Sequence, residues 1–508
     1  MTDDTTRDVD ADVDADVAIV GLGPTGLVLA ILLAQRGHRV VAFERWPEPY
    51  PLPRAVHFDH EVGRILQACG IGDELRTIIE PAGIYEWRNA AGATLLRFGR
   101  DGDAASGWPA SSMFSQPDLE RLLSDRLASL DGVDVRRGVE IVALEQRDGR
   151  VDLVTADDRR VGAMYVVGCD GARSTVRDLV GIEMTDHGFF YDWLIVDVEL
   201  HEPRVFEPTN LQVCDPARPT TAVSGGPGRR RWEFMRLPDE PVDELHREER
   251  AWELLAPWDI RPDNCTLVRH AVYTFAARHA SEWRAGSVFL AGDAAHQMPP
   301  FAGQGMCAGV RDAANLSWKL DHVLRGVADD AVLDTYAVER SPSARSAIDF
   351  SMELGKVICV PDADEAAARD EAMIAGVTDE PAPAPDLPGI DDGFIDDSPD
   401  AGALFVQGTI GGRPADDVLG VGWRIVSPFP VVLDDDLADW FASIDGVVSV
   451  VDPAAPDDPN TRRWFDSHGR HAVLQRPDFH VYGTAATDVE LARLLVRLRA
   501  ALTREVSP

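Results

Sequence analysis

Residues 16–26 read DVAIVGLGPTG, an apolar run rich in β-branched residues that passes directly into a glycine-rich turn. The next run, LVLAILLAQRG over 27–37, is typical of a buried helix that ends at Gly37. HRVVAFE, over 38–44, predicts a second strand that ends at Glu44. The whole stretch therefore predicts a βαβ unit with the glycines at its first turn.

The three glycines have separate tasks in such a turn. Gly21 permits the tight turn, Gly23 lets the backbone approach a pyrophosphate, and Gly26 lets the helix pack closely on the strand. Glu44 lies 18 residues beyond Gly26, where a carboxylate accepts hydrogen bonds from ribose hydroxyls. We expect an adenosine diphosphate group here, of either NAD or FAD, with contacts from Gly21, Gly23, Pro24, Thr25, Gly26, Glu44 and Arg45.

A second stretch, LAGDAAHQMPPFAGQG over 290–305, favours FAD. Gly292 and Asp293 end a predicted strand, and a short carboxylate there suits the hydroxyls of a ribityl chain, which FAD has and NAD lacks. Pro299 and Pro300 fix the backbone beside a flat ring. Gly303 and Gly305 expose backbone N–H groups before the next helix. Two distant segments are thus expected to hold the opposite ends of one flavin nucleotide.

Three motifs in order carry a resemblance to a known family: GLGPTG with Glu44, CDGARSTVR over 169–177, and LAGDAAHQMPPFAGQGMCAGVRDAANLSWKL over 290–320. The chain resembles the flavoprotein aromatic hydroxylases of the para-hydroxybenzoate hydroxylase type, most closely the 3-(3-hydroxyphenyl)propionate hydroxylases, over about residues 15–345. The resemblance implies FAD contacts from Arg54, Gln116, Asp170, Gly171, Gly292, Asp293, Pro300, Gly303, Gly305 and Met306. Arg121 and Asn315 are weaker candidates, and Arg121 reads equally well as a solvated charge.

The family chemistry implies NADPH or NADH as a transient co-substrate, since there is no second GxGxxG motif, with O2 and a phenol as the other reactants. The expected reaction is ortho-hydroxylation through a flavin C4a-hydroperoxide. His57 is the candidate acceptor of the phenolic proton, against the alternative of a purely structural histidine. Tyr191, Trp193 and Pro299 are candidates for the substrate pocket, although such aromatics are often core, and His296 either touches the flavin or supports its loop.

The expected fold class is α/β, with a Rossmann-like FAD-binding domain interleaved with a β-sheet substrate domain. The FAD-binding segments are 15–80, 110–185 and 275–345, and the substrate segments are 81–109 and 186–274. Residues 346–400 are expected to form a helix and a proline-rich acidic linker, and 360–400 to remain unpacked. Residues 401–508 resemble a thioredoxin-like C-terminal domain, with strands at WRIVS, VVLDD, VVSVVD and AVLQRPDFHVYGTA before a helix over 488–502.

The formal net charge of −37 argues against nucleic-acid and anionic-membrane partners. Residues 1–14 read as a disordered acidic tail without the features of a signal peptide. The six cysteines are scattered and form no CxxC pair, so we expect no metal site, no dithiol chemistry and a cytoplasmic location. The resemblance makes a homodimer possible.

Two alternative functions remain open on the sequence. The chain could be a flavin monooxygenase that tailors a larger polycyclic phenol in natural-product biosynthesis. It could also be a non-catalytic protein that binds FAD and an aromatic ligand.

Overall fold

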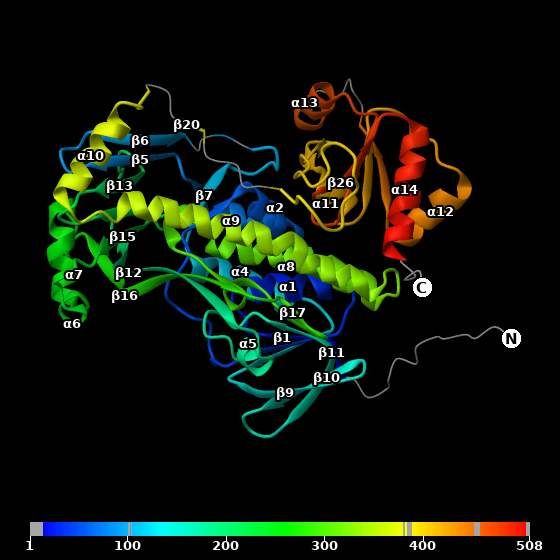
Figure 1. The fold of residues 1–508 in the computed structure, drawn as a ribbon, viewed down its shortest axis with the longest axis horizontal. Coiled ribbons are helices and arrows are strands. Elements are labelled where there is room, and N and C mark those ends of the chain that lie inside the picture. Colours follow the sequence, from blue (N-terminus) through cyan, green and yellow to red (C-terminus); the bar gives the residue numbers. More distant parts are fainter. Residues whose placement is uncertain are drawn as a thin grey trace.

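The computed structural model describes residues 14–99, 102, 104–378, 382–383, 389–451 and 458–503 (Figure 1). The predicted tail over 1–14 lies outside this range except for Asp14, whose backbone N–H donates to the carbonyl of Gly162 at 3.0 Å. The chain forms two large sheets joined by long helices and a separate C-terminal sheet. None of the described helices is long and apolar enough to cross a membrane.

The first sheet contains the predicted βαβ unit. Strands β1 (Ala15–Val20) and β2 (Val40–Glu44) are parallel neighbours, and α1 (Pro24–Ala34) joins them with nearly all of its side chains buried. A parallel sheet covered on both faces needs such continuous apolar runs, which explains the composition of 16–34. The strand order is β17-β18-β11-β1-β2-β8, with β10 and β9 attached beside β11. Their bounds are β8 Val133–Arg137, β9 Ile141–Arg147, β10 Arg150–Thr155, β11 Arg160–Gly168, β17 Arg284–Ala285 and β18 Val288–Leu290.

The segment at 288–290 returns to this sheet as predicted. Strand β18 pairs in parallel with β11, which itself pairs in parallel with β1. Since the carboxyl ends of parallel strands lie at one edge, the turn after β1 and the Gly292-Asp293 turn after β18 face the same side of the sheet.

The second sheet, called the substrate sheet below, has nine strands in the order β19-β16-β12-β15-β14-β13-β5-β6-β20. Its two longest strands, β12 (Met184–Leu200) and β16 (Cys265–Ala280), pair antiparallel and run from the first sheet region into the second (Figure 1). The expected segment boundaries at 186 and 275 fall inside these continuous strands. The other strands are β5 Ile84–Asn89, β6 Thr94–Gly99, β13 Asn210–Cys214, β14 Thr220–Ser224, β15 Arg229–Met235, β19 His296–Gln297 and β20 Ala382–Pro383.

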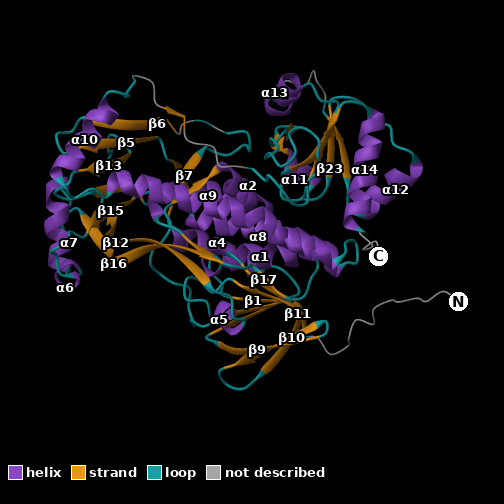
Figure 2. Cartoon of the chain, viewed as in Figure 1, coloured by secondary structure: helices purple, strands orange, loops and turns teal. Residues whose placement is uncertain are grey.

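Two long helices, α8 (Gly305–Leu324) and α9 (Thr335–Ile358), run across the molecule and link its parts (Figure 2). Helix α8 begins directly after the glycine-rich loop and packs against α1. A small three-stranded sheet of β3 (His57–Asp59), β7 and β4 lies beside them. The remaining elements of this part are β4 Ile79–Pro81, β7 Ser111–Phe114, α2 His60–Leu66, η1 Gln67–Ile71, α3 Gly72–Ile78, α4 Gln116–Ala128, α5 Thr175–Leu179, α6 Val242–Leu245, α7 Glu248–Leu255, η2 Ala256–Trp258, η3 Gly292–Ala294, η4 Pro300–Ala302 and η5 Asp330–Asp334.

The expectation that 360–400 is unpacked is wrong for residues 363–374. Residues Ala363–Ile374 form helix α10, which Asp362 caps by accepting from two backbone N–H groups. Arg369 of α10 donates to the carbonyl of Cys214 at 2.6 Å and so ties the helix to the substrate sheet. The ADEAAARDEA composition favours a helix, and the proline-rich signal applies only to the residues after it. Of those, 379–381 and 384–388 lie outside the described residues.

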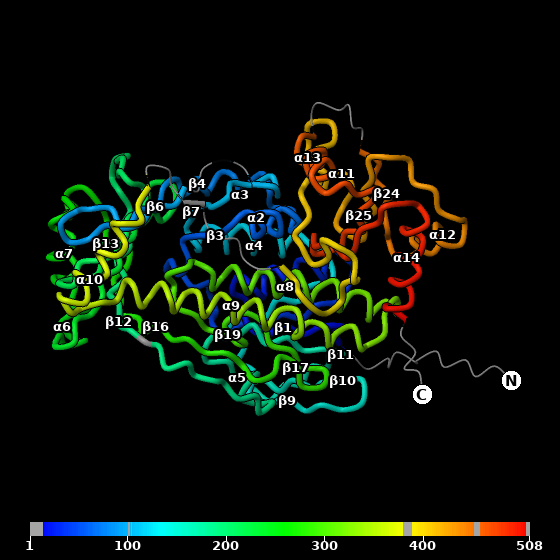
Figure 3. Tube along the Cα trace, turned by 45° about the horizontal axis from the view of Figure 1, so that its top comes forward, coloured from blue at the N-terminus to red at the C-terminus, as the bar shows by residue number. Residues whose placement is uncertain are grey.

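The C-terminal region packs around its own four-stranded sheet, of order β24-β23-β25-β26 (Figure 3). The expected strand at VVLDD is wrong, because residues 431–434 form a loop after two prolines and Asp434 caps the next helix. The thioredoxin-like assignment stays a prediction. The elements are β21 Thr409–Ile410, β22 Arg413–Pro414, α11 Ala415–Leu419, β23 Arg424–Ser427, α12 Asp435–Ser443, β24 Val447–Val450, α13 Pro459–His468, β25 Ala472–Gln475, β26 Val481–Ala485 and α14 Asp488–Leu502.

Candidate functional site

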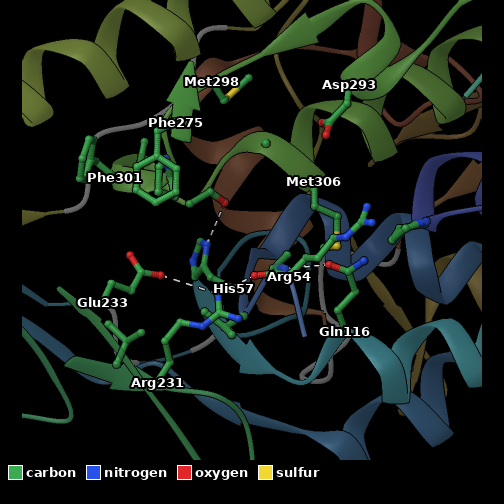
Figure 4. Close-up of a pocket in the computed structure, with 18 of the residues that line it drawn as sticks. Arg54, His57, Gln116, Arg231, Glu233, Phe275, Asp293, Met298, Phe301 and Met306 are labelled. Carbon is green, nitrogen blue, oxygen red and sulfur yellow. Dashed lines mark hydrogen bonds and ion pairs between the residues drawn. The ribbon is translucent and has the colours of Figure 1, made fainter. Parts of the chain in front are cut away.

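A cavity of about 400 Å³ lies between the two large sheets (Figure 4). The turn after β1, the segment before β3, the loop from Asp293 to Met306 and the substrate sheet all contribute to its wall. Of the predicted contacts, the wall contains Gly23, Pro24, Thr25, Arg54, His57, Gln116, Gly171, Asp293, Pro300, Gly303, Gly305 and Met306. Residues more than 260 positions apart in the chain therefore share one cavity, as the two glycine-rich motifs predict.

A second cavity of about 130 Å³ continues toward the end of β2. Gly23, Arg54, Cys169 and Gly171 line both cavities, so the two form one elongated site. The predicted contacts that line the second cavity are Gly21, Gly23, Glu44, Arg45, Arg54, Asp170 and Gly171. A long ligand can therefore extend from the β1–α1 turn to the substrate sheet.

The glycines of the first turn meet distinct geometric demands. Gly21 has a φ of +101°, which L side chains rarely adopt. A Cβ on Gly26 would collide with the carbonyl oxygen of Gly21, whereas a Cβ on Gly23 would meet no protein atom within 4 Å. Gly21 and Gly26 are thus needed by the fold, and Gly23 leaves open space where α1 begins. A helix N-terminus that faces open space suits a phosphate group.

The carboxylate of Glu44 is held at the mouth of the second cavity. Its two oxygens accept from the backbone N–H groups of Leu22 and Trp46, each at 3.0 Å. These bonds fix the carboxylate beside the glycine turn, and each oxygen retains a further lone pair for a ligand hydroxyl.

Asp293 faces the large cavity from the loop after β18. Its side chain is exposed where it lines the large cavity. Desolvation by the surrounding protein raises the pKa of its carboxyl, and the charges of His296 and Arg54 oppose that shift. Gly292, with a φ of +62°, lies against Thr25 of the first turn, where an added Cβ would approach the threonine Oγ1 to 2.8 Å. This close approach brings the two predicted motifs together.

His296 supports the loop and is absent from both cavity walls. Its Nε2 lies 2.7 Å from Asp312 Oδ2, and both side chains are fully buried. The same carboxylate accepts from the backbone N–H of Gly292 at 3.0 Å. Of the two roles considered for His296, the geometry corresponds to loop support.

His57 lies in the wall of the large cavity and is anchored at both ring nitrogens. Nδ1 is 3.3 Å from the carbonyl oxygen of Gly303, and Nε2 is 2.5 Å from Ser111 Oγ. A carbonyl cannot donate, so the neutral ring carries its proton on Nδ1 and accepts from the Ser111 hydroxyl at Nε2. The basic nitrogen of His57 therefore points toward Ser111.

Gln116 and Arg54 lie near each other at the flank of the cavity. Gln116 accepts from the backbone N–H of Ala55 through Oε1 and donates through Nε2 to Glu120, each at 2.7 Å. The Arg54 guanidinium lies over the ring of Tyr50, 4.4 Å from its centre. Burial raises the pKa of Glu120 although its hydrogen bond to Gln116 opposes the shift.

The aromatic candidates lie behind the wall. Phe275 and Phe301 line the cavity, and the fully buried Trp193 packs on both, with ring centres 6.2 and 5.7 Å away. Tyr191 packs on Phe189 at 5.1 Å, and Pro299 precedes the turn η4. Tyr191, Trp193 and Pro299 are absent from the cavity wall. For Tyr191 and Trp193 this corresponds to the alternative of an aromatic side chain in the core.

Three further residues use their polar groups within the protein. Asp170 accepts from Ser174 Oγ, the N-cap residue of α5, at 2.5 Å and from the Val176 N–H in the first turn of that helix at 3.0 Å. Arg121 is exposed and paired with Asp118, as expected for a solvated charge. Asn315 is buried away from both cavities and donates to Glu339 and Asp478.

The wall also contains residues that the sequence analysis missed, chiefly Arg231 and Glu233 of β15. Arg231 is buried and donates to Asp197 through Nε at 2.7 Å. The signal was present in RRRWEFM over 229–235, where charged and apolar residues alternate with the period of a strand. The other missed wall residues include Tyr85, Met113, Asn210, Thr221, Val223, Phe275, Met298 and Phe301.

Comparison with known proteins gives a consistent picture. Residues 14–351 match the model of a family described as FAD binding domain. A probable NADH-specific resorcinol 4-hydroxylase of Rhodococcus jostii (strain RHA1) is 39% identical, covering 96% of this chain and 95% of that protein. A 3-(3-hydroxy-phenyl)propionate/3-hydroxycinnamic acid hydroxylase of Mycobacterium sp. (strain JLS) is 35% identical, covering 95% of this chain and 91% of that protein.

Solved structures share the fold along nearly the whole chain. Aklavinone-11 hydroxylase, solved with FAD and aklavinone, has a TM-score of 0.73 at 26% identity, covering 96% of this chain and 99% of that one. The flavin-dependent monooxygenase PieE, solved with FAD and substrate, has a TM-score of 0.76 at 23% identity, covering 96% and 100%. The latter likeness bears on the fold alone.

Proposed function

This chain belongs to the FAD-binding family of aromatic hydroxylases, and from that membership we propose that it uses NADH or NADPH and O2 to hydroxylate a small phenol ortho to its hydroxyl group. The observation that carries the proposal is the single cavity shared by the β1–α1 turn, the Asp293–Met306 loop and the substrate sheet. A flavin ring and an aromatic substrate held in this cavity would lie within reach of each other.

The residues present fit FAD. The open space at Gly23 suits a pyrophosphate, Glu44 faces the end where an adenosine ribose would lie, and Asp293 suits a ribityl chain. Gly303, with a φ of +67°, and Gly305 leave the loop backbone close to the large cavity, where a flavin ring would lie. When bound and reduced, FAD supplies the activation of O2 for transfer of one oxygen atom to the ring.

The protein must orient the phenol, exclude water and receive the phenolic proton. We propose that His57 holds that proton. His57 lines the cavity and its basic Nε2 faces the Ser111 hydroxyl, so we propose that this hydroxyl relays the proton to His57 Nε2. The Met298, Phe275 and Phe301 side chains make this end of the cavity apolar.

The size of the cavity favours a one-ring phenol. About 400 Å³ is at the lower end of the range of small-molecule sites, roughly 300–1,000 Å³, and it must also accept the flavin ring system. The names of the two relatives above, a resorcinol hydroxylase and a hydroxyphenylpropionate hydroxylase, suggest the first compounds to test.

The test is oxygen consumption by the FAD-loaded protein with NADH or NADPH and individual phenols. We expect substrate-stimulated NADH or NADPH oxidation coupled to one hydroxylated product, with the new hydroxyl group ortho to the old one. If only polycyclic phenols gave NADH or NADPH oxidation coupled to hydroxylation, the alternative of a monooxygenase that tailors a larger phenol would replace the proposal. No turnover with any phenol would refute it. The expected cytoplasmic location and the possible homodimer stay predictions.

A further inference from the structure

One carboxylate of the substrate sheet, that of Glu233, faces the large cavity. The residue is 7% exposed, lies on β15 two positions after Arg231, and shares that residue's face of the strand. Figure 4 shows both side chains at one side of the cavity and Asp293 at the other. Glu233 therefore lies away from Asp293, the residue proposed to hold the ribityl chain.

The polar neighbours of Glu233 in the cavity wall are already engaged. Asn210 donates to the carbonyl of Ala82 at 2.6 Å, and Thr221 donates its hydroxyl to Gln212 at 2.6 Å. Arg231 donates to both oxygens of Asp197 and to the carbonyls of Pro53 and Arg54. These groups hold the wall together and have little capacity left for a ligand.

Glu233 lacks such ties. Its nearest cationic atom, Arg231 Nη1, is 3.7 Å from Oε1, which is too long for a hydrogen bond, and within the described part of the chain the carboxylate accepts none. Burial raises the pKa of Glu233, opposed by Arg231 and Arg269 and reinforced by Asp197. A buried carboxylate without a donor is costly, so a ligand that supplies an O–H group gains from meeting it.

The charges around Glu233 disfavour a second anion. Asp197 already neutralises Arg231, and Arg269 lies 3.9 Å from the same aspartate. Arg54, the other arginine of the cavity wall, lies over Tyr50 and borders the second cavity as well. A substrate carboxylate beside Glu233 would therefore face a like charge in a poorly solvated wall.

We propose that Glu233 accepts a hydrogen bond from a hydroxyl group of the substrate, and that it thereby selects neutral phenols with two hydroxyl groups over phenols with a carboxylate side chain. This inference rests on the proposed function, whose substrate class it narrows. Glu233 is the specificity-determining residue, and its hydrogen bond holds the ring by one hydroxyl group.

The test is calorimetric measurement of dissociation constants with the FAD-loaded protein. The probes are neutral 1,3-dihydroxybenzene and anionic 3-(3-hydroxyphenyl)propionate. We expect the unchanged protein to prefer the diphenol by roughly tenfold or more, and Glu233→Gln to weaken diphenol binding by roughly 10- to 100-fold, the usual range for a hydrogen bond to a charged group. The same variant should bind the propionate at least as tightly as the unchanged protein does.

Two further variants keep the test decisive. Glu233→Asp retains the charge but moves the carboxylate back from the cavity by one methylene group. The diphenol should therefore bind more weakly, while the propionate remains disfavoured. Glu86→Gln makes the same carboxyl-to-amide change at a similarly buried position of the same sheet, where Arg88 and Thr94 already donate to the carboxylate. That control should retain the ligand preference, and flavin content checks that each variant is folded.

The outcomes separate this inference from the proposed function. Equal affinity for both probes in the unchanged protein, or an equal loss of both in Glu233→Gln, overturns the role of Glu233 even when the protein hydroxylates phenols. Failure of every phenol to stimulate NADH or NADPH oxidation overturns the proposed function, and the substrate selection falls with it.

Discussion

Two buried groups of polar residues in this molecule differ in whether all of their carboxylates accept hydrogen bonds. The interface cluster joins α8 and α9 to the C-terminal sheet and consists of Asn315, Lys319, Glu339, Arg476 and Asp478. The pocket cluster lines the cavity and consists of Asp197, Arg231, Glu233 and Arg269.

In the interface cluster both carboxylates accept hydrogen bonds, although Asn315 Oδ1 and Lys319 Nζ make none among the described residues. Arg476 donates to Glu339 at 2.7 Å, to Asp478 at 2.6 Å and to the carbonyl of Phe394 at 2.9 Å. Lys319 lies 2.9 Å from Glu339, and all these side chains are almost fully inaccessible. In the pocket cluster Arg231 is equally engaged, but Glu233 is not. A closed network of this kind fixes how two parts of a chain dock, whereas an open carboxylate at a cavity is available to a ligand.

The largest effect is expected when the closed cluster is broken. Arg476→Met leaves Glu339 and Asp478 without their main partner, and removal of one member of a buried ion pair costs about 3–5 kcal/mol. Chemical denaturation should show this loss in the free energy of unfolding, with the ligand preference of the folded fraction unchanged.

The matched control for that variant is Arg497→Met. Arg497 pairs with Asp396 in the same region, but half of its side chain is exposed, so about 0–1 kcal/mol is expected. Equal losses in the two variants would mean that the closed cluster has no special role in stability.

The next effect concerns catalysis in the cavity. His57→Ala should slow hydroxylation by roughly 10²-fold or more, the usual contribution of a general base, and leave the reduction of the flavin by NADH or NADPH nearly unchanged. Rapid-mixing absorbance measurements separate the two steps. Equal slowing of both would rule out His57 as the proton acceptor.

Ser111→Ala tests the route of the proton. Because the His57 basic nitrogen faces the Ser111 hydroxyl, the serine variant should slow the same step and leave flavin reduction unaffected. A full rate of hydroxylation in Ser111→Ala would show that the phenol reaches His57 directly.

The sequence predicted those parts of the site that depend on local backbone geometry. The glycine turn at 21–26 and the loop at 292–305 carry conformations that few other residues allow, and the structure brings both to one cavity. It did not predict Arg231 or Glu233, because their positions depend on how β15 pairs with β12 and β14. Trp193 was a candidate for the pocket with a core side chain as its alternative, and it packs behind the wall.

A smaller effect distinguishes space that the fold uses from space left for a ligand. Gly23→Ala adds a Cβ that meets no protein atom within 4 Å, so the unfolding temperature of the flavin-free protein should not change. The affinity of the Gly23→Ala variant for FAD should fall by roughly tenfold, because the added methyl group enters the space proposed for the pyrophosphate. Gly26→Ala should lower both the unfolding temperature and the FAD affinity, since its Cβ meets the Gly21 carbonyl. An unaltered FAD affinity in Gly23→Ala would contradict the proposal that the pyrophosphate binds at this turn.

The smallest effect is a dependence of stability on pH at the closed cluster. Burial lowers the pKa of Lys319 from 10.5 to about 8, against the pull of Glu339. Between these two values the unfolded chain binds the proton more tightly than the folded chain, so this residue makes the protein more stable as the pH rises from 8 toward 10.5. The difference in unfolding free energy between the unchanged protein and Lys319→Met should therefore shift in favour of the unchanged protein by on the order of 1 kcal/mol over pH 8–9.5. A difference that is constant across this range would mean that Glu339 holds Lys319 charged, and the cluster would then be a fully ionised network.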